Sequence, residues 1–194
     1  MGGGELVMTY LMVEELHDMH FKSVGKNVYV SDKAVFHNPG NISIGDNSRI
    51  DDFCMLSAGE GGIVIGKHVH ISCYASLLGK GKITLEDFVA VSVRASIFSS
   101  SDDYSGNFMT NPTVPEHYTN VQHAGVTLEK HVMIGAGSIV LPGVVIGRGT
   151  VIGALSLVKK SCGVFGVYCG VAAKLIKERE RGLLRLEEEL THAP

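Results

Sequence analysis

Histidine and carboxylate side chains that could move protons gather in one polar stretch, residues 97–126. Its sequence reads IFSSSDDYSGNFMTNPTVPEHYTNVQHAGV, and His123 stands near its end. A histidine beside a nucleophile is the commonest general base in proteins. Asp102 and Asp103, near the start, could orient such a base or bind an ammonium group, although a plain Asx turn explains them equally well. Stretches of this length without a repeat are usually functional loops or disordered, and Tyr104 can help to anchor this one.

The composition indicates a globular chain without a charge signature for large partners. The 194 residues are 45% apolar and carry a formal net charge of −3. This gives no basic footprint for nucleic acid, and no apolar run approaches the roughly 20 residues that span a bilayer. Four cysteines form no CxxC pair, and the first residues lack the basic start of a signal peptide. We therefore expect reduced thiols, a cytoplasmic location, no nucleic-acid partner and no membrane insertion.

A repeat of six residues surrounds the polar stretch and has to position it. From Val24 onward an aliphatic residue or phenylalanine recurs every six residues, usually followed by a small or polar residue. A period of six fits neither a helix nor a plain alternating strand. It fits short strands joined by tight corners, with the leading residue of each unit pointing inward. Glycines such as Gly45 and Gly66 follow leading residues, where the backbone has to approach its neighbour closely.

The interruptions of the repeat show how many units form one turn. The step of six lengthens to 8 after Phe36, to 9 after Leu56, to 8 after Leu77 and to 31 after Ile97. Every extra segment thus follows a third unit. Three units per turn give a triangular coil in which all insertions leave one corner. We therefore predict an all-β fold, a parallel β-helix of about six coils with one long extruded loop at 99–125.

The two ends of such a coil need caps, because a β-helix exposes unpaired backbone there. Residues 4–19 space their apolar side chains roughly as an amphipathic helix does, which predicts an N-terminal cap helix. We expect the cap to span 1–23 and the β-helix domain, with its loop, to span 24–171. Residues 172–194 are strongly charged and are predicted to form a C-terminal helix that packs on the coil.

Three motifs near the end of the repeat carry a family resemblance: IGAGS, IGALSLVKK and VYCGVAAKLIK. Together they make residues 24–177 similar to the hexapeptide-repeat acyltransferases, whose fold is a left-handed parallel β-helix. The resemblance to galactoside and maltose acetyltransferases implies acetyl-CoA as acyl donor. It places the donor contacts on Ala136, Ala154, Lys159, Lys160, Lys174 and Lys177. Lysines suit the phosphates of coenzyme A as point charges. The chain departs from the family pattern at Cys169 and Ala172.

The same resemblance suggests roles for the polar loop. In the family this corner lies against a neighbouring subunit of a homotrimer, and the acyl site forms between them. Serine acetyltransferases place their base similarly to His123, which makes His123 the predicted general base. Galactoside acetyltransferases instead have a histidine near the start of the loop, where this chain has three serines, Ser99–Ser101. His117 and His131 are weaker candidates, and His131 is expected to face outward from a regular repeat.

The acyl acceptor is predicted from the loop motifs SSSDDYSG and TNPTVP. They resemble dTDP-amino-dideoxyhexose N-acyltransferases and galactoside O-acetyltransferase-like enzymes of surface-polysaccharide biosynthesis. This implies an acetyl-CoA-dependent acetyltransferase whose acceptor is a sugar, preferably a nucleotide-linked amino sugar. Asp102, Asp103 and Tyr104 are the predicted acceptor contacts. An O-acetyltransferase of sugar hydroxyls and a xenobiotic acetyltransferase remain alternatives.

Two other functions are compatible with the same coil. γ-Class carbonic anhydrases use three converging histidines on a zinc ion. Here His68 and His70 are one residue apart, and His117 and His123 have five residues between them. These spacings do not supply a converging tetrahedral set, so we predict no metal site. A non-catalytic β-helix that serves assembly is the second alternative, and the lysines at the end of the repeat argue weakly against it.

Overall fold

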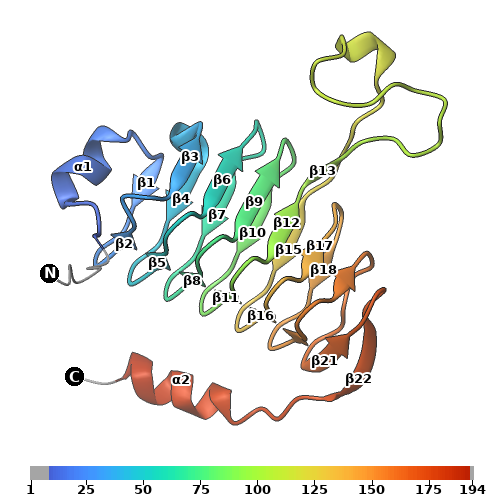
Figure 1. The fold of residues 1–194 in the computed structure, drawn as a ribbon. Helices are drawn as coiled ribbons and strands as arrows, with labels where there is room; N and C mark the ends of the chain where they lie inside the picture. Colours follow the sequence, from blue (N-terminus) through green and yellow to red (C-terminus); the bar gives the residue numbers. More distant parts are fainter. Residues whose placement is uncertain (1–8, 193–194) are drawn as a thin grey trace, which may run out of the picture.

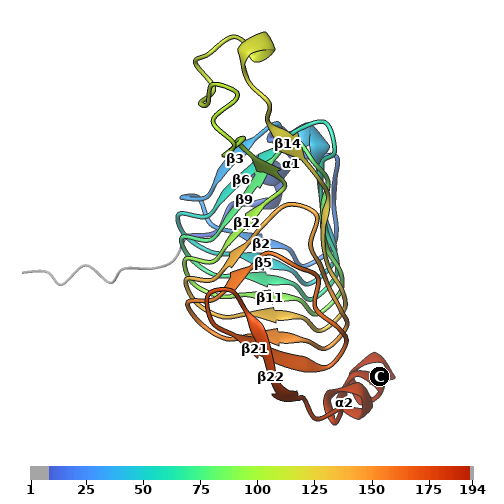
Figure 2. The ribbon, with the colours of Figure 1, turned by 90° about the vertical axis from the view of Figure 1, so that its right-hand side faces the viewer.

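The computed structural model describes residues 9–192 and is a left-handed parallel β-helix with three sheets as its sides (Figures 1 and 2). The first sheet stacks β1 (Ser23–Val24), β4 (Ile42–Ile44), β7 (Ile63–Ile65), β10 (Ile83–Leu85), β15 (Val126–Leu128) and β18 (Val145–Ile146). The second sheet stacks β2 (Tyr29–Val30), β5 (Arg49–Ile50), β8 (His70–Ile71), β11 (Ala90–Val91), β16 (Met133–Ile134), β19 (Val151–Ile152), β21 (Gly166–Cys169) and β22 (Lys174–Glu178). The third sheet stacks β3 (Val35–His37), β6 (Met55–Ala58), β9 (Ser76–Gly79), β12 (Ser96–Phe98), β17 (Ile139–Val140) and β20 (Leu157–Val158).

Each strand pairs in parallel with the strand three elements further on within the regular part of the coil. Three strands therefore make one turn, as the repeat of six predicted. Six turns are complete, and β21 begins a seventh. We call the bend between the first and second sheets the first corner, the next bend the second corner, and the bend from the third sheet back to the first the third corner. The insertions at 38–41, 59–62, 80–82 and 99–125 all lie at the third corner, which confirms the predicted arrangement.

The leading residues of the repeat fill the inside of the coil. Ile50, Ile71, Leu77, Leu128 and Ile146 are fully buried, and residues of the same kind line every turn. Burying one such side chain contributes about 1.5–3 kcal/mol, so the column is the main source of stability. Alternate residues of the strands point outward, which fixes the face that each sheet presents to a ligand or subunit.

Tight corners explain the glycines that follow the leading residues. A Cβ placed on Gly45 would lie 2.6 Å from the backbone of Gly66 in the next turn. The first corner also uses left-handed backbone at non-glycine residues, including Asn47 (φ 58°), His68 (φ 56°) and His131 (φ 63°). Side chains at this corner stack from turn to turn, and the rings of His68 and His131 each lie 4.9 Å from Phe88.

The N-terminal end is covered by a short helix, α1 (Val13–Asp18), with Leu16 buried against the first turn. The predicted helix over residues 4–19 is therefore shorter within the described part of the chain, and residues 4–8 of that prediction lie outside it. Residue Tyr10, just before α1, forms an antiparallel bridge with Ser31 instead of a helical turn. No helix among residues 9–192 is long and apolar enough to cross a membrane.

The C-terminal end differs from the helix predicted from residue 172 onward. Lys174–Glu178 forms β22, which pairs antiparallel with β21 and extends the second sheet. The helix α2 begins only at Leu183 and ends at Thr191. The predicted helix is wrong for residues 174–178 because the open edge of the last turn offers backbone partners that an extended segment can satisfy.

Helix α2 lies along the first corner, on the side of the coil away from the loop (Figure 2). The Glu187 carboxylate accepts a hydrogen bond from Lys130. Its oxygens also lie 2.7 Å from the His131 imidazole and 3.8 Å from the Arg148 guanidinium. His131 does face outward from its repeat, as expected, but α2 covers it. Before the helix, Arg179 donates to the carbonyl oxygens of His131 and Gly149. These contacts make residues 179–191 a strap on the first corner.

Candidate active site

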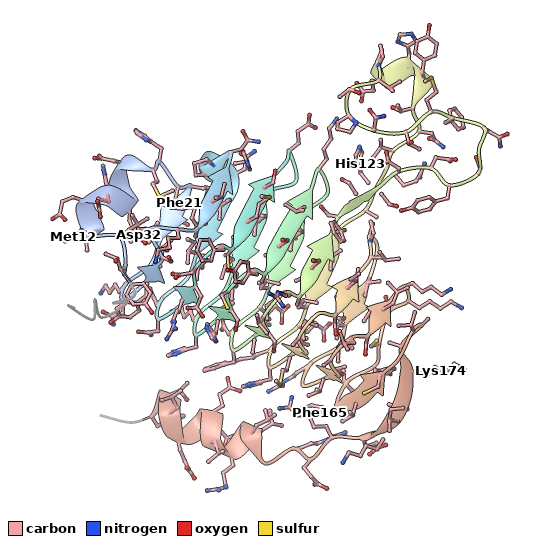
Figure 3. All side chains as sticks on the ribbon, viewed as in Figure 1. Met12, Phe21, Asp32, His123, Phe165 and Lys174 are labelled. Atoms are coloured by element: carbon pink, nitrogen blue, oxygen red, sulfur yellow. The ribbon has the colours of Figure 1, made fainter. Side chains whose placement is uncertain are left out.

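The extruded loop leaves the third corner on a two-stranded stem (Figure 1). Strand β13 (Ser100–Ser101) pairs antiparallel with β14 (Gln122–His123), and Ser100 lies directly opposite His123. This pairing brings the last residues of the loop back beside its first ones. His123 therefore lies beside the start of the loop, where this chain has Ser99–Ser101 in place of the histidine of galactoside acetyltransferases. Figure 3 shows His123 at the base of the loop.

The loop is ordered by its own polar side chains. The Asp103 carboxylate accepts hydrogen bonds from the backbone N–H and hydroxyl of Ser105 and from the Asn120 side chain. These hydrogen bonds hold the pKa of Asp103 below its ordinary value. The short helix η2 (Glu116–Tyr118) closes the far end, where Lys80 of the coil lies 3.6 Å from Glu116. Asp103 thus forms an Asx turn that orders the loop, which is one of the two interpretations that the sequence allowed for it.

A cavity of about 810 Å³ lies between the loop and the third corner of turns one to four. Polar side chains face it among apolar neighbours, and they include Asn38, Ser57, Lys80, Asp102 and His123. Hydrogen-bond donors and acceptors from both the coil and the loop converge here. We call this space the loop cavity.

A second cavity of about 520 Å³ lies on the other side of the loop stem, against the outer face of the third sheet. Phe98, Ile139, Leu141 and Leu157 give it an apolar floor, and Tyr104, which is 90% exposed, stands at its rim. We call this space the sheet cavity.

Asp102 and Ser100 are the polar residues that border both cavities. Asp102 is half-buried, and within residues 9–192 no hydrogen bond or ion pair engages its carboxylate. Ser100 contacts His123, with 2.7 Å between its hydroxyl oxygen and the imidazole Nδ1. A substrate group held in the loop cavity can therefore meet one from the sheet cavity beside Asp102. This junction is where a bond between two substrates can be made.

The apolar floor of the sheet cavity leads toward the predicted donor lysines. Ile139 of β17 pairs with Leu157 of β20, and Leu157 is bridged to Val171 in the next turn. Lys159 and Lys160 follow β20 at the third corner and are exposed. The outer face of the third sheet is thus an apolar track that begins at Asp102 and ends beside cations.

The remaining predicted donor contacts lie at the second corner and on the second sheet. Ala136 and Ala154 occupy successive turns of the second corner, where the Leu155 N–H donates to the Ala136 carbonyl oxygen. Lys174 and Lys177 are exposed on β22, opposite Cys169 and Val167 of β21 (Figure 3). The structure therefore brings Lys159 and Lys160 together, but it separates them from Ala136 and Ala154. A donor that touches both sets has to span the outer face of the third sheet or lie between two subunits.

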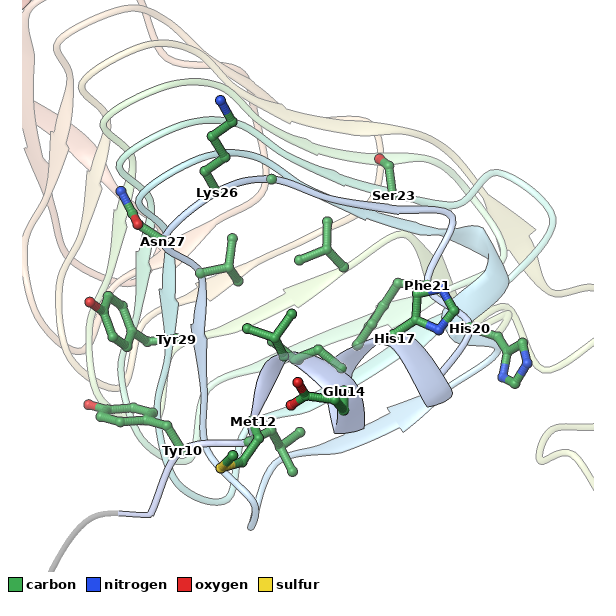
Figure 4. A pocket seen from close by; sticks show the side chains of 16 residues that line it. Tyr10, Met12, Glu14, His17, His20, Phe21, Ser23, Lys26, Asn27 and Tyr29 are labelled. Atoms are coloured by element: carbon green, nitrogen blue, oxygen red, sulfur yellow. The ribbon is translucent and has the colours of Figure 1, made fainter.

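A third cavity, about 1230 Å³, lies at the N-terminal end beneath α1, and none of the predicted site residues lines it. Figure 4 shows its mainly apolar lining, which includes Met12, Phe21 and Tyr29, with His17 and His20 near the helix. This space is the open end of the coil, where the first turn has no turn before it. Among residues 9–192 no three His, Cys, Asp or Glu side chains are grouped to hold a metal ion.

Comparison with known proteins decides the family. The model of the bacterial transferase hexapeptide, six repeats, matches residues 125–160. A dTDP-4-amino-4,6-dideoxy-D-glucose acyltransferase of Escherichia coli is 55% identical over 180 residues, which cover 93% of this chain and 94% of that protein. The chain belongs to the hexapeptide-repeat acyltransferases. It is thus an enzyme of the acyltransferase class.

Solved structures of this acyltransferase family agree with the fold. AntD, an N-acyltransferase from Bacillus cereus, superposes with a TM-score of 0.91 and 45% sequence identity, covering 95% of this chain and 97% of its own. It has been solved in complex with dTDP and 3-hydroxybutyryl-CoA. Galactoside acetyltransferase in complex with coenzyme A shares the fold at a TM-score of 0.57 and 22% identity, with 86% of this chain and 70% of that chain covered.

The sequence predicted His123 and Asp102, which line the loop cavity, but did not name Ser100 as a candidate, although its hydroxyl contacts His123. It named Ser100 only as a departure from the family pattern. The signal that could have found it is the hairpin stem, because two antiparallel strands at the loop base place the residues at its two ends opposite each other.

Proposed function

We propose that this enzyme transfers an acetyl group from acetyl-CoA to the amino group of a dTDP-linked 4-amino-4,6-dideoxyhexose, in surface-polysaccharide biosynthesis in the cytoplasm. The observation that carries the proposal is the junction at Asp102, where the loop cavity, with its hydrogen-bonding side chains, meets the apolar floor of the sheet cavity. The E. coli relative is a dTDP-4-amino-4,6-dideoxy-D-glucose acyltransferase. AntD has also been solved with dTDP-4-amino-4,6-dideoxyglucose and coenzyme A.

The two cavities suit the two substrates. The loop cavity, with Asn38, Ser57 and Lys80 in its wall, offers polar partners and a cation to a nucleotide-linked sugar. The sheet cavity offers an apolar floor to the pantetheine arm, and Lys159 and Lys160 offer cations to the phosphates of coenzyme A. In this arrangement the sugar amine and the thioester carbon meet beside Asp102.

The reaction needs a proton acceptor and a stabiliser of the oxyanion. The amine nitrogen attacks the thioester carbon, the C–S bond breaks, and the proton lost by the nitrogen balances the proton taken up by the thiolate. His123 and Asp102 are the two candidates for these tasks, because both side chains border the loop cavity. AntD has been studied with substitutions of a serine and of an aspartate ten positions later. In this chain Ser92 and Asp102 are the one serine–aspartate pair with that spacing, which supports Asp102 as the base.

The active unit is proposed to be a homotrimer. Ser92 belongs to the second corner and Asp102 to the third corner of the same turn, so β12 separates them along one side of the triangle. A site that uses both residues therefore has to combine corners of two subunits. Exposed apolar residues on the second corner, including Phe53, Tyr74 and Leu155, supply a surface for that contact.

The test is an assay of the purified protein with dTDP-4-amino-4,6-dideoxyglucose and acetyl-CoA, following release of the CoA thiol and the mass of the sugar product. We expect thiol release that depends on the amine and yields an amide. A parallel assay with 3-hydroxybutyryl-CoA reports on the length of the acyl group. No thiol release with either donor on the amino sugar would contradict the proposal.

A second candidate function is O-acetylation of a sugar hydroxyl. A putative lipopolysaccharide biosynthesis O-acetyl transferase of E. coli strain K12, WbbJ, is 29% identical over 147 residues, covering 73% of this chain and 74% of that protein. The matched dTDP-sugar with a hydroxyl in place of the amine distinguishes the two reactions. Faster turnover on the hydroxyl sugar would favour this second function.

A further inference from the structure

Ser100 holds the His123 ring through a hydroxyl group that has two partners. The Lys80 backbone N–H donates to the Ser100 oxygen over 2.8 Å, and the His123 Nδ1 lies 2.7 Å from the same oxygen. Gly79 makes this possible, because a Cβ there would lie 2.8 Å from the Ser100 hydroxyl oxygen and 2.4 Å from that of Ser99.

These contacts favour one position for the imidazole proton. The Lys80 N–H can only donate, so the Ser100 oxygen accepts in that contact and its O–H proton needs an acceptor. Among residues 9–192 the acceptor within reach of that proton is His123 Nδ1, 2.7 Å away. If Nδ1 instead donated to the second lone pair of the oxygen, the Ser100 O–H would have no protein acceptor in this part of the chain. A nitrogen that accepts a hydrogen bond carries no proton. Neutral imidazole keeps one N–H, which then stands on Nε2.

We propose that Ser100 is a positioning residue that fixes His123 as the Nε2–H tautomer, so that His123 donates a hydrogen bond in the acceptor site. The inference deepens the proposed acyl transfer and rests on it for its consequence. An Nε2–H can stabilise the oxyanion formed from the thioester carbonyl. It cannot accept the proton of the attacking amine, so that proton goes to Asp102 and the released thiolate takes one up from the site or solvent. His123 is then the donor of the pair and Asp102 the base.

The first measurement reads the tautomer directly in the free enzyme. Long-range ¹H–¹⁵N correlation spectra distinguish a protonated ring nitrogen from an unprotonated one, and the His123→Gln variant assigns the signals. We expect Nε2–H for His123 in the wild type and a mixture of tautomers in Ser100→Ala. Ser100→Thr, which keeps the hydroxyl, should restore the wild-type pattern. Ser101→Ala is the matched control, because within the described residues the Ser101 hydroxyl donates to the Asp102 carbonyl oxygen and not to the ring. Its His123 signals should stay unchanged.

The second measurement separates positioning from binding. Ser100→Ala should lower kcat about 3- to 10-fold, in line with one lost hydrogen bond, and leave the KM values nearly unchanged. An Nδ1–H ring in the wild type, or an unaltered Nε2–H ring in Ser100→Ala, overturns the proposal. The wild-type spectrum alone decides the tautomer if Ser100→Ala does not fold. Because the spectra are taken without substrates, failure of the tautomer proposal leaves the assay of acyl transfer unaffected, and the reverse also holds.

Discussion

Two adjacent aspartates in the loop have different environments. The Asp103 carboxylate is fully engaged by Ser105 and Asn120 and shapes the loop. Asp102 lines both the loop cavity and the sheet cavity, and no hydrogen bond or ion pair engages its carboxylate among residues 9–192. A carboxylate kept free at a junction of two substrates is available for chemistry, whereas one held by three donors is not.

Substitution of the two aspartates tests this division. Asp102→Asn keeps the size of the side chain and removes the proton acceptor, so we expect kcat to fall by about 10²–10⁴-fold. Asp103→Asn is the matched control. It should make the loop more susceptible to proteolysis and change kcat much less than Asp102→Asn does. The measurements are steady-state turnover and limited proteolysis of both variants. Equal turnover of Asp102→Asn and the wild type would exclude Asp102 as the base.

Lys159 and Lys160 allow a separate test of donor binding. The double variant Lys159→Ala/Lys160→Ala should raise the KM for acetyl-CoA at low salt, at about 1 kcal/mol or less per exposed phosphate contact, and leave the KM for the sugar unchanged. The difference from the wild type should shrink as salt is added, because screening weakens exposed charge pairs. Lys26→Ala/Lys67→Ala, on the first corner, is the control with equal loss of charge. If both double variants behave alike, the donor does not bind at the end of the third sheet.

At the residue scale the sequence predicted the loop of the candidate site but not which of its carboxylates are left without a hydrogen-bond partner. Asp102 and Asp103 have the same type and neighbouring positions, and only the fold of the loop gives one of them three donors. The role of Ser100 was also hidden, because it depends on a contact with a residue 23 positions away.

At the scale of single elements the repeat predicted the strands well and the C-terminal end poorly. Leading residues such as Ile71 and Leu77 have the same environment in every turn, so their spacing alone determines strand and corner. The segment Lys174–Glu178 is charged and has no hexad spacing, and it becomes a strand through pairing with β21. Such pairing is a tertiary effect that local propensity does not contain.

Helix α2 is expected to detach from the coil in acid. Burial alone would raise the pKa of Glu187, but hydrogen bonds from Lys130 and His131 outweigh it and lower this pKa. The lowered pKa means that the ionised Glu187 carboxylate stabilises the docked helix. This stabilisation is fully present above the pKa of the unfolded state, near 4.3, and is lost as the pH falls through the lower pKa of the folded state. Hydrogen exchange of residues 183–191 should therefore accelerate in that acidic range.

The variant Glu187→Gln should detach helix α2 from the coil without acid. Its α2 should exchange quickly already at neutral pH and show little further change on acidification. Glu188→Gln is the matched control, since Glu188 is exposed and its side chain has no ion pair among residues 9–192. Slow exchange of α2 in Glu187→Gln at neutral pH would show that other contacts hold the strap.

At the scale of the whole molecule, the triangular coil places Ser92 and Asp102 at two different corners. If active sites combine these corners from neighbouring subunits of a trimer, two inactive variants can complement each other. Coexpression of Ser92→Ala with Asp102→Asn in equal amounts should restore about one quarter of the wild-type sites, those between an intact Ser92 and an intact Asp102. Turnover of the mixed oligomer checks this, with each pure variant as reference. Activity no higher than in the pure variants would place both residues in sites within one subunit.

The extruded loop also affects the order in which the turns of the coil form during folding. Ser96 of β12 pairs with Ser76, 20 positions earlier, and with Ile139, 43 positions later. Repeat solenoids grow by adding each turn to the one before it. Closing the longer segment costs about 0.7 kcal/mol more chain entropy than closing a regular turn. Growth from the fourth turn to the fifth is therefore expected to be about threefold slower than the addition of a regular turn, so the coil should form as two blocks that join beneath the loop.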